Sequence, residues 1–162
     1  MKKVGLIMGS DSDLPIVEKA VAILKEFGIE YEAHVYSAHR TPKEVDDFTS
    51  KAYDNGFGVI IAFAGMAAHL AGAVAARTVL PVIGVPCKSS NLDGLDALLS
   101  TVQMPTGIPV ATVAINGGAN AALLAAQIIG VEDKELYSKL KAKRESDAEK
   151  VLKKDADLVG KL

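Results

Sequence analysis

The sequence contains no tryptophan, and only 5% of its 162 residues are aromatic. It therefore has little material for the stacking platforms that hold single-stranded nucleic acid. It also lacks a charge excess, because 18 basic and 20 acidic side chains give a formal net charge of −2. Proteins that bind the backbone of DNA or RNA usually present a basic surface, so we expect no nucleic-acid partner.

Cysteine is nearly absent, since Cys87 is the only one. A single thiol cannot form an internal disulfide or build a cysteine zinc site, and this usage is typical of a reducing compartment. The apolar run at the N-terminus ends after Met8 and is too short for a signal peptide, so we expect a cytoplasmic protein. Cys87 follows Pro86 in an apolar context, which predicts an inert side chain.

Long unbroken apolar runs are also missing. The range 97–131 contains no charged residue, but prolines, glycines and asparagines interrupt it, and a histidine and two glycines interrupt the range 59–76. A lipid-exposed helix needs an unbroken apolar run, so we expect no membrane segment. Beyond Val131 the chain changes character, because 17 of the 31 residues in 132–162 are charged, a pattern typical of a solvated helix.

The remaining pattern predicts a single α/β domain over residues 1–162, in which short apolar runs alternate with segments of helical periodicity. The expected strands are 3–8, 30–36, 59–63, 81–85 and 110–114. The expected helices are 14–27, one starting at 42, 67–77, 92–103, 120–129 and a C-terminal one over about 132–158. Continuous apolar strands between helices predict a parallel sheet covered on both faces. We expect a three-layer α/β/α sandwich with a flavodoxin-like sheet of order 2-1-3-4-5.

Two helices carry more specific predictions. Thr41, Pro42 and Glu44 form the pattern of a capping box at the start of one helix. The segment 120–129 is apolar around nearly its whole circumference, so either another subunit or the charged C-terminal helix must cover it. We favour another subunit, because so small a domain rarely buries an entire helix by itself.

Three loops after the first three expected strands hold most of the polar chemistry, at the edge where open α/β sheets bind ligands. The loop 9–13 offers a glycine, two hydroxyls and a helix N-terminus, which together suit a phosphate. A simpler interpretation is that Ser12 or Asp13 caps the following helix. The Asp13 carboxylate also suits two neighbouring sugar hydroxyls.

The loop 37–42 places His39 next to Arg40. Arg40 stays charged and can hold an anion, whereas His39 can give and take a proton. His69, in a loop rich in Gly and Ala, is either a ligand contact or a structural histidine, and His34 is predicted to lie on the surface. No carboxylate or cysteine accompanies these histidines at ligand spacing, so we expect no metal site.

Seven segments in this order resemble the PurE family of purine biosynthesis, and together they span almost the whole chain. They are Gly9-Ser-x-Ser-Asp13, Ser37-Ala-His-Arg-Thr-Pro42, Ala67-Ala-His-Leu70, Leu80-Pro-Val-Ile-Gly-Val-Pro86, Val102-Gln-Met-Pro105, Gly107-Ile-Pro-Val110 and Asn120-Ala-Ala-Leu-Leu124. The arginine of Ser-Ala-His-Arg resembles the class I form of the family, since class II usually has a lysine there.

The resemblance implies an isomerase, an N5-carboxyaminoimidazole ribonucleotide mutase that moves a carboxylate from the exocyclic nitrogen to ring carbon 4 through carbon dioxide and aminoimidazole ribonucleotide. It implies a homo-octamer, a phosphoribosyl aminoimidazole substrate and no cofactor. His39 matches the catalytic histidine. The positions matched to substrate binding and its surrounding shell are Gly9, Ser10, Ser12, Asp13, Ser37, Ala38, Arg40, Gly65, Ala67, His69 and Leu70.

The third loop departs from the family pattern Gly-Ala-Gly-Gly-Ala-Ala-His-Leu-Pro-Gly-Met. Its substitutions for two glycines, the proline and the methionine are Phe63, Met66, Ala71 and Ala73. One alternative is a class II enzyme that carboxylates aminoimidazole ribonucleotide with free carbon dioxide. Another is a non-catalytic flavodoxin-like module that binds a phosphate ligand. A phosphoacceptor of this kind needs an Asp at the end of strand three and a Lys after strand five, where the chain has Phe63-Ala64-Gly65 and Asn116.

Overall fold

The computed structural model describes residues 1–161 and contains a five-stranded parallel sheet in the order β2-β1-β3-β4-β5. Its strands are β1 (Lys3–Met8), β2 (Tyr31–Val35), β3 (Phe57–Gly65), β4 (Val82–Cys87) and β5 (Ala111–Thr112). Its α-helices are α1 (Leu14–Phe27), α2 (Pro42–Lys51), α3 (Leu70–Ala75), α4 (Leu95–Val102), α5 (Gly118–Gly130) and α6 (Lys134–Val159). Short 3-10 turns precede α1 and α4, at Asp11–Asp13 and Leu92–Gly94. The predicted strand order and helix alternation are confirmed.

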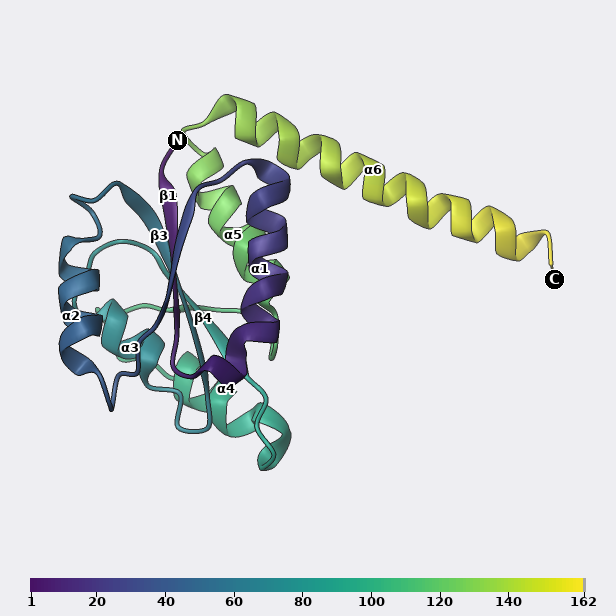
Figure 1. Cartoon of the computed structure of the whole chain (residues 1–162). Helices are drawn as coiled ribbons and strands as arrows, with labels where there is room; N and C mark the ends of the chain where they lie inside the picture. The colour runs from purple at the N-terminus through teal and green to yellow at the C-terminus, as the bar shows by residue number, and fades with distance from the viewer. Residues whose placement is uncertain (162) are drawn as a thin grey trace.

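Helices cover both faces of the sheet, as the three-layer prediction requires (Figure 1). Val4, Leu6 and Met8 of β1 face the core under α1 and α5, whereas Ile7 faces the core under α2 and α3. Successive side chains of a strand point to opposite faces of the sheet, so this alternation shows that both faces of β1 are buried. Helix α4 packs on β4 at Gly84, where a Cβ atom would lie 2.3 Å from Thr101 Cγ2.

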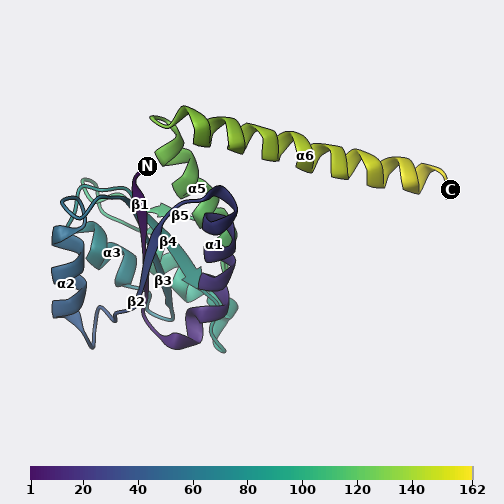
Figure 2. The same cartoon turned by 45° about the horizontal axis from the view of Figure 1, so that its top comes forward.

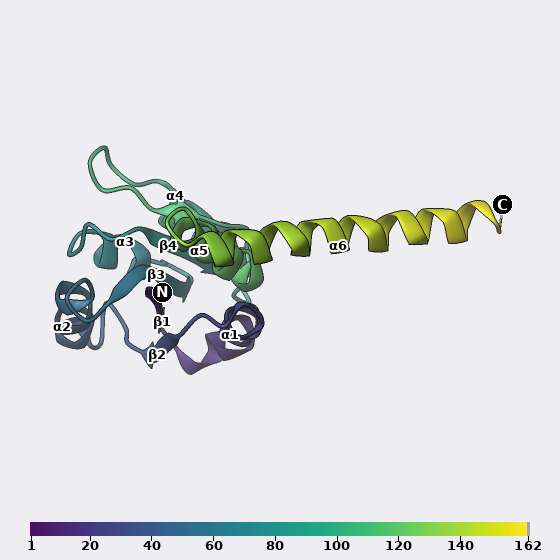
Figure 3. The ribbon, with the colours of Figure 1, turned by 90° about the horizontal axis from the view of Figure 1, so that it is seen from above.

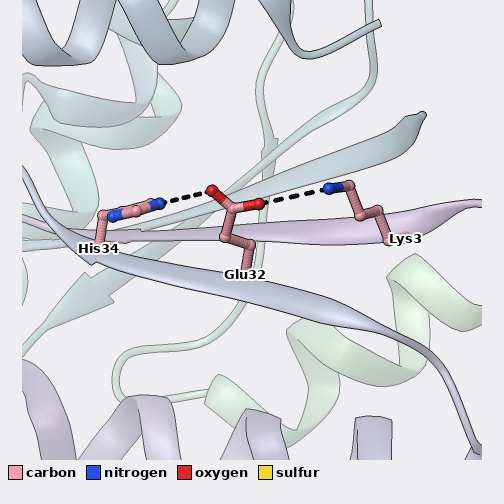
Figure 4. A network of polar contacts seen from close by, with 3 residues as sticks. All are labelled: Lys3, Glu32 and His34. Atoms are coloured by element: carbon pink, nitrogen blue, oxygen red, sulfur yellow. Dashed lines mark hydrogen bonds and ion pairs between the residues drawn. The ribbon is translucent and has the colours of Figure 1, made fainter. Parts of the chain in front are cut away.

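Strand β2 forms one edge of the sheet, and its side chains are only partly covered. His34, predicted to lie on the surface, is half-buried: its ring stacks on Tyr36 with 4.6 Å between centroids and meets the edge of Phe48. Glu32 accepts hydrogen bonds from His34 and from Lys3, at 2.8 and 3.3 Å (Figure 4). The hydrogen bond from His34 holds the pKa of Glu32 below its ordinary value. His34 is therefore a structural residue of this edge.

Element boundaries differ from the sequence-based prediction most clearly in β3, β5 and α3. β3 extends to Gly65, two residues further than expected, whereas β5 has two residues instead of five and α3 begins only at Leu70. The capping box at α2 is absent. Thr41 Oγ1 accepts a hydrogen bond from Ser37 N at 2.8 Å and donates one to Ser37 O at 3.2 Å, so this hydroxyl stabilises the preceding loop instead.

Helix α5 is covered mainly by its own chain. Its alanines 121, 122, 125 and 126 are buried between the sheet and α1, and Leu136 at the start of α6 belongs to the same core. Leu123, Leu124 and Ile128 remain partly exposed. Neither predicted cover is needed for most of the inner face, because the sheet and α1 cover it and α6 adds Leu136. The favoured prediction, another subunit, stays open for these three residues.

Helix α6 leaves the body of the molecule after its first turns and extends away from it (Figures 2 and 3). Lys143 still reaches Glu26 of α1 at 3.2 Å, but every residue from 144 to 161 is exposed. The confirmed C-terminal helix thus stands alone over most of its length. None of the helices within residues 1–161 is both long enough and apolar enough to span a bilayer.

Candidate active site

The loop after β1 is held by its own serines. Ser10 is extended, and its hydroxyl accepts hydrogen bonds from Ser12 N at 3.3 Å and Ser12 Oγ at 3.0 Å, which starts the turn Asp11–Asp13. Gly9 N donates to Phe63 O at 3.0 Å and fixes this loop to the end of β3. Asp13 precedes α1 but makes no side-chain hydrogen bond to it, so the interpretation that Ser12 or Asp13 caps the helix is wrong; Ser10 caps the 3-10 turn Asp11–Asp13.

Asp13 is the buried acid of the site, with 8% of its surface exposed. Burial raises the pKa of its carboxyl group, and the neighbouring Cys87 thiol opposes this effect by a hydrogen bond. Burial, followed by the nearby Asp13 carboxylate, raises the pKa of Cys87, so the thiol stays protonated. Cys87 is thus a buried, protonated neighbour of Asp13, which agrees with the predicted inert side chain.

The loop after β2 is a compact turn around Ser37. The Ser37 hydroxyl accepts hydrogen bonds from the backbone N–H groups of His39 and Arg40, at 3.3 and 3.2 Å. This turn sends the two neighbouring side chains to different places. The Arg40 guanidinium donates to Gly9 O at 3.0 Å, joining the β1 and β2 loops, whereas His39 reaches the loop after β3.

His39 and His69 meet across the site although 29 residues separate them in the sequence. His39 Nε2 lies 2.7 Å from His69 Nδ1, and the two rings are nearly perpendicular, at 83°. At this distance one nitrogen must donate the proton and the other accept it, so the two facing positions share one proton. His69 was predicted to be either a ligand contact or a structural histidine. Its hydrogen-bond partner is His39, the histidine predicted to transfer protons, so His69 lies within the site.

The loop after β3 supplies the small residues of the site. At Gly65 a Cβ atom would lie 3.1 Å from Cys87 O, which explains the glycine. Met66 adopts φ 55°, a left-handed conformation that favours glycine, and its side chain is 61% exposed. Met66 therefore stands in a backbone conformation that glycine adopts most easily, and it adds a thioether to the surface of the loop.

These loops surround a cavity of about 710 Å³ at the carboxyl edge of the sheet. All twelve residues predicted for the site line it: Gly9, Ser10, Ser12, Asp13, Ser37, Ala38, His39, Arg40, Gly65, Ala67, His69 and Leu70. The sequence analysis missed Lys88 and Ser89, which follow β4 and line the same cavity. Their signal was their place directly after a strand of the same parallel sheet, since ligands bind beyond such strand ends.

Two further observations limit the chemistry. Within residues 1–161, no three His, Cys, Asp or Glu side chains are arranged to hold a metal ion. A larger hollow of about 1020 Å³ lies at the opposite, amino-terminal edge of the sheet, and neither His nor Cys lines it. Of these two cavities, the one at the carboxyl edge is therefore the one that contains histidines.

Comparison with known proteins agrees with this site. Residues 3–150 match the family model described as AIR carboxylase. The chain belongs to the AIR carboxylase family. A curated relative from Thermotoga maritima, N5-carboxyaminoimidazole ribonucleotide mutase, is 55% identical over 154 residues, covering 95% of this chain and 90% of the relative. This membership confirms the predicted resemblance and the prediction that the chain is an enzyme.

Two further family members frame the comparison. Phosphoribosylaminoimidazole carboxylase of Saccharomyces cerevisiae is 54% identical over 151 residues, which cover 93% of this chain but only 26% of that protein. The crystal structure of Treponema denticola PurE superposes with a TM-score of 0.87 at 37% identity, covering 96% of this chain and 97% of that one. The family fold thus extends over nearly all of both chains.

Proposed function

We propose that this AIR carboxylase family member is an N5-carboxyaminoimidazole ribonucleotide mutase of de novo purine biosynthesis. The observation that carries the proposal is the His39–His69 contact at 2.7 Å, in a cavity that also holds Arg40 and a buried carboxylate. The name of the Thermotoga maritima relative supports the same reaction. The name of the yeast relative supports the alternative, a carboxylase that uses free carbon dioxide.

The substrate groups and the side chains of the cavity match by chemistry. Arg40, Ser10 and Ser12 present a cation and two hydroxyls to a phosphate. The Asp13 carboxylate accepts hydrogen bonds from two ribose hydroxyls. The small residues of the β3 loop leave room for a planar imidazole next to His39.

His39 performs two proton transfers in this proposal. It donates a proton to the carbamate nitrogen, the C–N bond breaks, and carbon dioxide and aminoimidazole ribonucleotide form. Carbon 4 then attacks the carbon dioxide, a C–C bond forms, and His39 removes the proton from that carbon, so no net proton is consumed. A confined cavity keeps carbon dioxide next to its acceptor, and this proximity is a large part of the rate.

His69 assists by holding the His39 ring. Because one of the two facing nitrogens must donate and the other accept, the contact couples the tautomers of both rings. No carboxylate or cysteine takes part in that pairing, and the proposed reaction needs neither a metal nor an organic cofactor.

We further propose that the enzyme is a cytoplasmic homo-octamer. The isolated helix α6 supports assembly, because Val151, Leu152, Leu158 and Val159 are each more than half exposed. Spacings of one and seven residues place these side chains on one side of the helix. An exposed apolar stripe of this kind is typical of an interaction surface, and we propose that a second copy of the chain covers it.

The decisive assay supplies the purified enzyme with two substrates in separate reactions without ATP. We expect rapid conversion of N5-carboxyaminoimidazole ribonucleotide to 4-carboxy-5-aminoimidazole ribonucleotide. A strong preference for aminoimidazole ribonucleotide with bicarbonate would contradict the mutase assignment and favour the carboxylase. Absence of turnover with either substrate would overturn both.

A further inference from the structure

Lys88 is a cation of the cavity that the proposed chemistry has not yet used. It follows β4 directly, and the only other side chains lining the cavity with a formal charge are Asp13 and Arg40. A ribonucleotide with a carboxylated base carries a phosphate and a carboxylate. Without Lys88 the charged side chains of the cavity would cancel, because Arg40 is a cation and Asp13 an acid, and the two anionic groups of the ligand would share one cation.

The backbone of Lys88 is fixed from two sides. Its N–H donates to Asn116 Oδ1 at 2.8 Å, and Asn116 N in turn donates to Pro86 O at 2.8 Å. Gly94 packs against it, since a Cβ atom there would lie 3.2 Å from Lys88 Cα. The position of the residue is therefore set by the fold, while its long side chain can still change direction.

The ammonium group has an exchangeable partner. Lys88 Nζ lies 2.9 Å from Asp93 Oδ1, and the two side chains are 54% and 85% exposed. Ion pairs this exposed contribute little to stability, because water screens them and two flexible side chains must be ordered. An anion entering the cavity can therefore take the place of Asp93.

Lys88 and Arg40 approach the cavity from opposite sides. Arg40, in the loop after β2, bonds to Gly9 in the loop after β1, whereas Lys88 follows β4, and β3 lies between β1 and β4. Neighbouring strands are about 4.8 Å apart, so the ends of β1 and β4 are separated by about 10 Å. That separation suits one ligand with an anion at each end.

We propose that Lys88 binds the carboxylate of the carboxylated ribonucleotide and exchanges Asp93 for it. The inference rests on the proposed function, in which Arg40 and the serines bind the phosphate. Lys88 is then a specificity-determining residue, because it distinguishes carboxylated ligands from aminoimidazole ribonucleotide, which lacks that group.

The test measures binding of two ligands by isothermal titration calorimetry. In Lys88→Ala the affinity for 4-carboxy-5-aminoimidazole ribonucleotide should fall by about 10- to 100-fold, the range for a hydrogen bond between charged groups. The affinity for aminoimidazole ribonucleotide should stay within about twofold. Lys19→Ala, which removes an exposed lysine of α1 outside the cavity, is the matched control and should change neither affinity.

The outcomes separate this inference from the proposed function. Unchanged affinity of Lys88→Ala for the carboxylated ligand would overturn the role of Lys88, and an equal loss for both ligands would assign Lys88 to the phosphate instead. A wild-type enzyme that binds neither ligand would overturn the proposed function itself. Asp93→Asn should bind the carboxylated ligand at least about twofold more tightly; weaker binding would contradict the exchange.

Discussion

At the scale of single residues, Asp13 is placed for binding at the expense of stability. Its carboxylate is almost completely removed from water, and burial raises its pKa in the folded state. The folded protein therefore holds this proton more tightly than the unfolded chain does. Folding stability consequently falls as pH rises from the ordinary value of 3.8 through the raised pKa, and stays lower above it.

Replacing Asp13 by Asn removes this penalty. We expect Asp13→Asn to raise the free energy of unfolding at pH 7 by about 1 kcal/mol and to lower turnover, as is common when a functional site is relaxed. The gain should shrink near pH 3, where the wild-type carboxyl group is protonated in both states. Urea denaturation at the two pH values measures the effect, with Asp11→Asn, an exposed neighbour, as control. A variant less stable than wild type at pH 7 would contradict this account.

Met66 shows where single residues resist prediction. The sequence identified it as a departure from a family glycine, but only the structure shows that its backbone keeps φ 55°. A non-glycine residue in this region costs about 1 kcal/mol, and such strain persists only where the surrounding loop imposes it. The sign of φ at such a position depends on the contacts of the surrounding loop, and these cannot be inferred from the residue type alone.

At the scale of elements, the residues of the site lie in the loops that follow the carboxyl ends of the strands. The central strands were predictable because β1, β3 and β4 are continuous apolar runs. The strand order predicted that the loops after β1 to β3 form the site, and the resemblance to the PurE family supplied its twelve individual residues. The short β5 and the absent capping box were not predictable, because tertiary contacts decide them. Thr41 matches a capping pattern, yet it bonds to Ser37 within the loop after β2.

Which loops contact one another could not be predicted from the sequence either. Periodicity indicated that three loops share an edge, but it could not show that Arg40 reaches Gly9 or that His39 reaches His69. These contacts depend on the side-chain directions that the turn around Ser37 imposes. Lys88 was missed for a similar reason, since its role depends on a fourth strand end, away from the histidine and arginine motifs.

Arg40 joins the β1 and β2 loops and is the proposed cation for the substrate phosphate, so we expect Arg40→Ala to bind the substrate more weakly. Loss of the guanidinium removes a charged hydrogen-bond donor to the phosphate, so KM should rise by about 10- to 100-fold. Lys43→Ala, which removes a cation of α2 outside the cavity, should leave KM unchanged. Initial rates at varied substrate concentration measure both variants. An unchanged KM in Arg40→Ala would contradict the phosphate role.

At the scale of the whole molecule, helix α6 is the least explained feature within one copy of the chain. Residues 144 to 161 are all exposed, and their apolar side chains share one side of the helix. An isolated helix is only marginally stable in water, so packing must contribute most of its stability. The sequence predicted the helix from its charges but could not show that it leaves the body of the molecule.

Assembly should therefore depend on that apolar stripe. We expect wild type to behave as an octamer of the 16.9 kDa chain by light scattering, and the double variant Val151→Glu/Leu152→Glu to form smaller species. Ser146→Glu/Lys153→Glu adds two glutamates on the opposite side of α6 and should keep the wild-type mass. A monomeric wild-type protein, or a stripe variant with unchanged mass, would contradict the assignment.

The central claim is that the imidazole of His39 moves the proton in the reaction. The most direct measurement compares wild type and His39→Asn in conversion of N5-carboxyaminoimidazole ribonucleotide, together with calorimetric affinity for aminoimidazole ribonucleotide. We predict a loss of turnover of about 100-fold or more, the range for removing a general acid and base, with affinity within a few-fold of wild type. Near-normal turnover in His39→Asn would contradict the account.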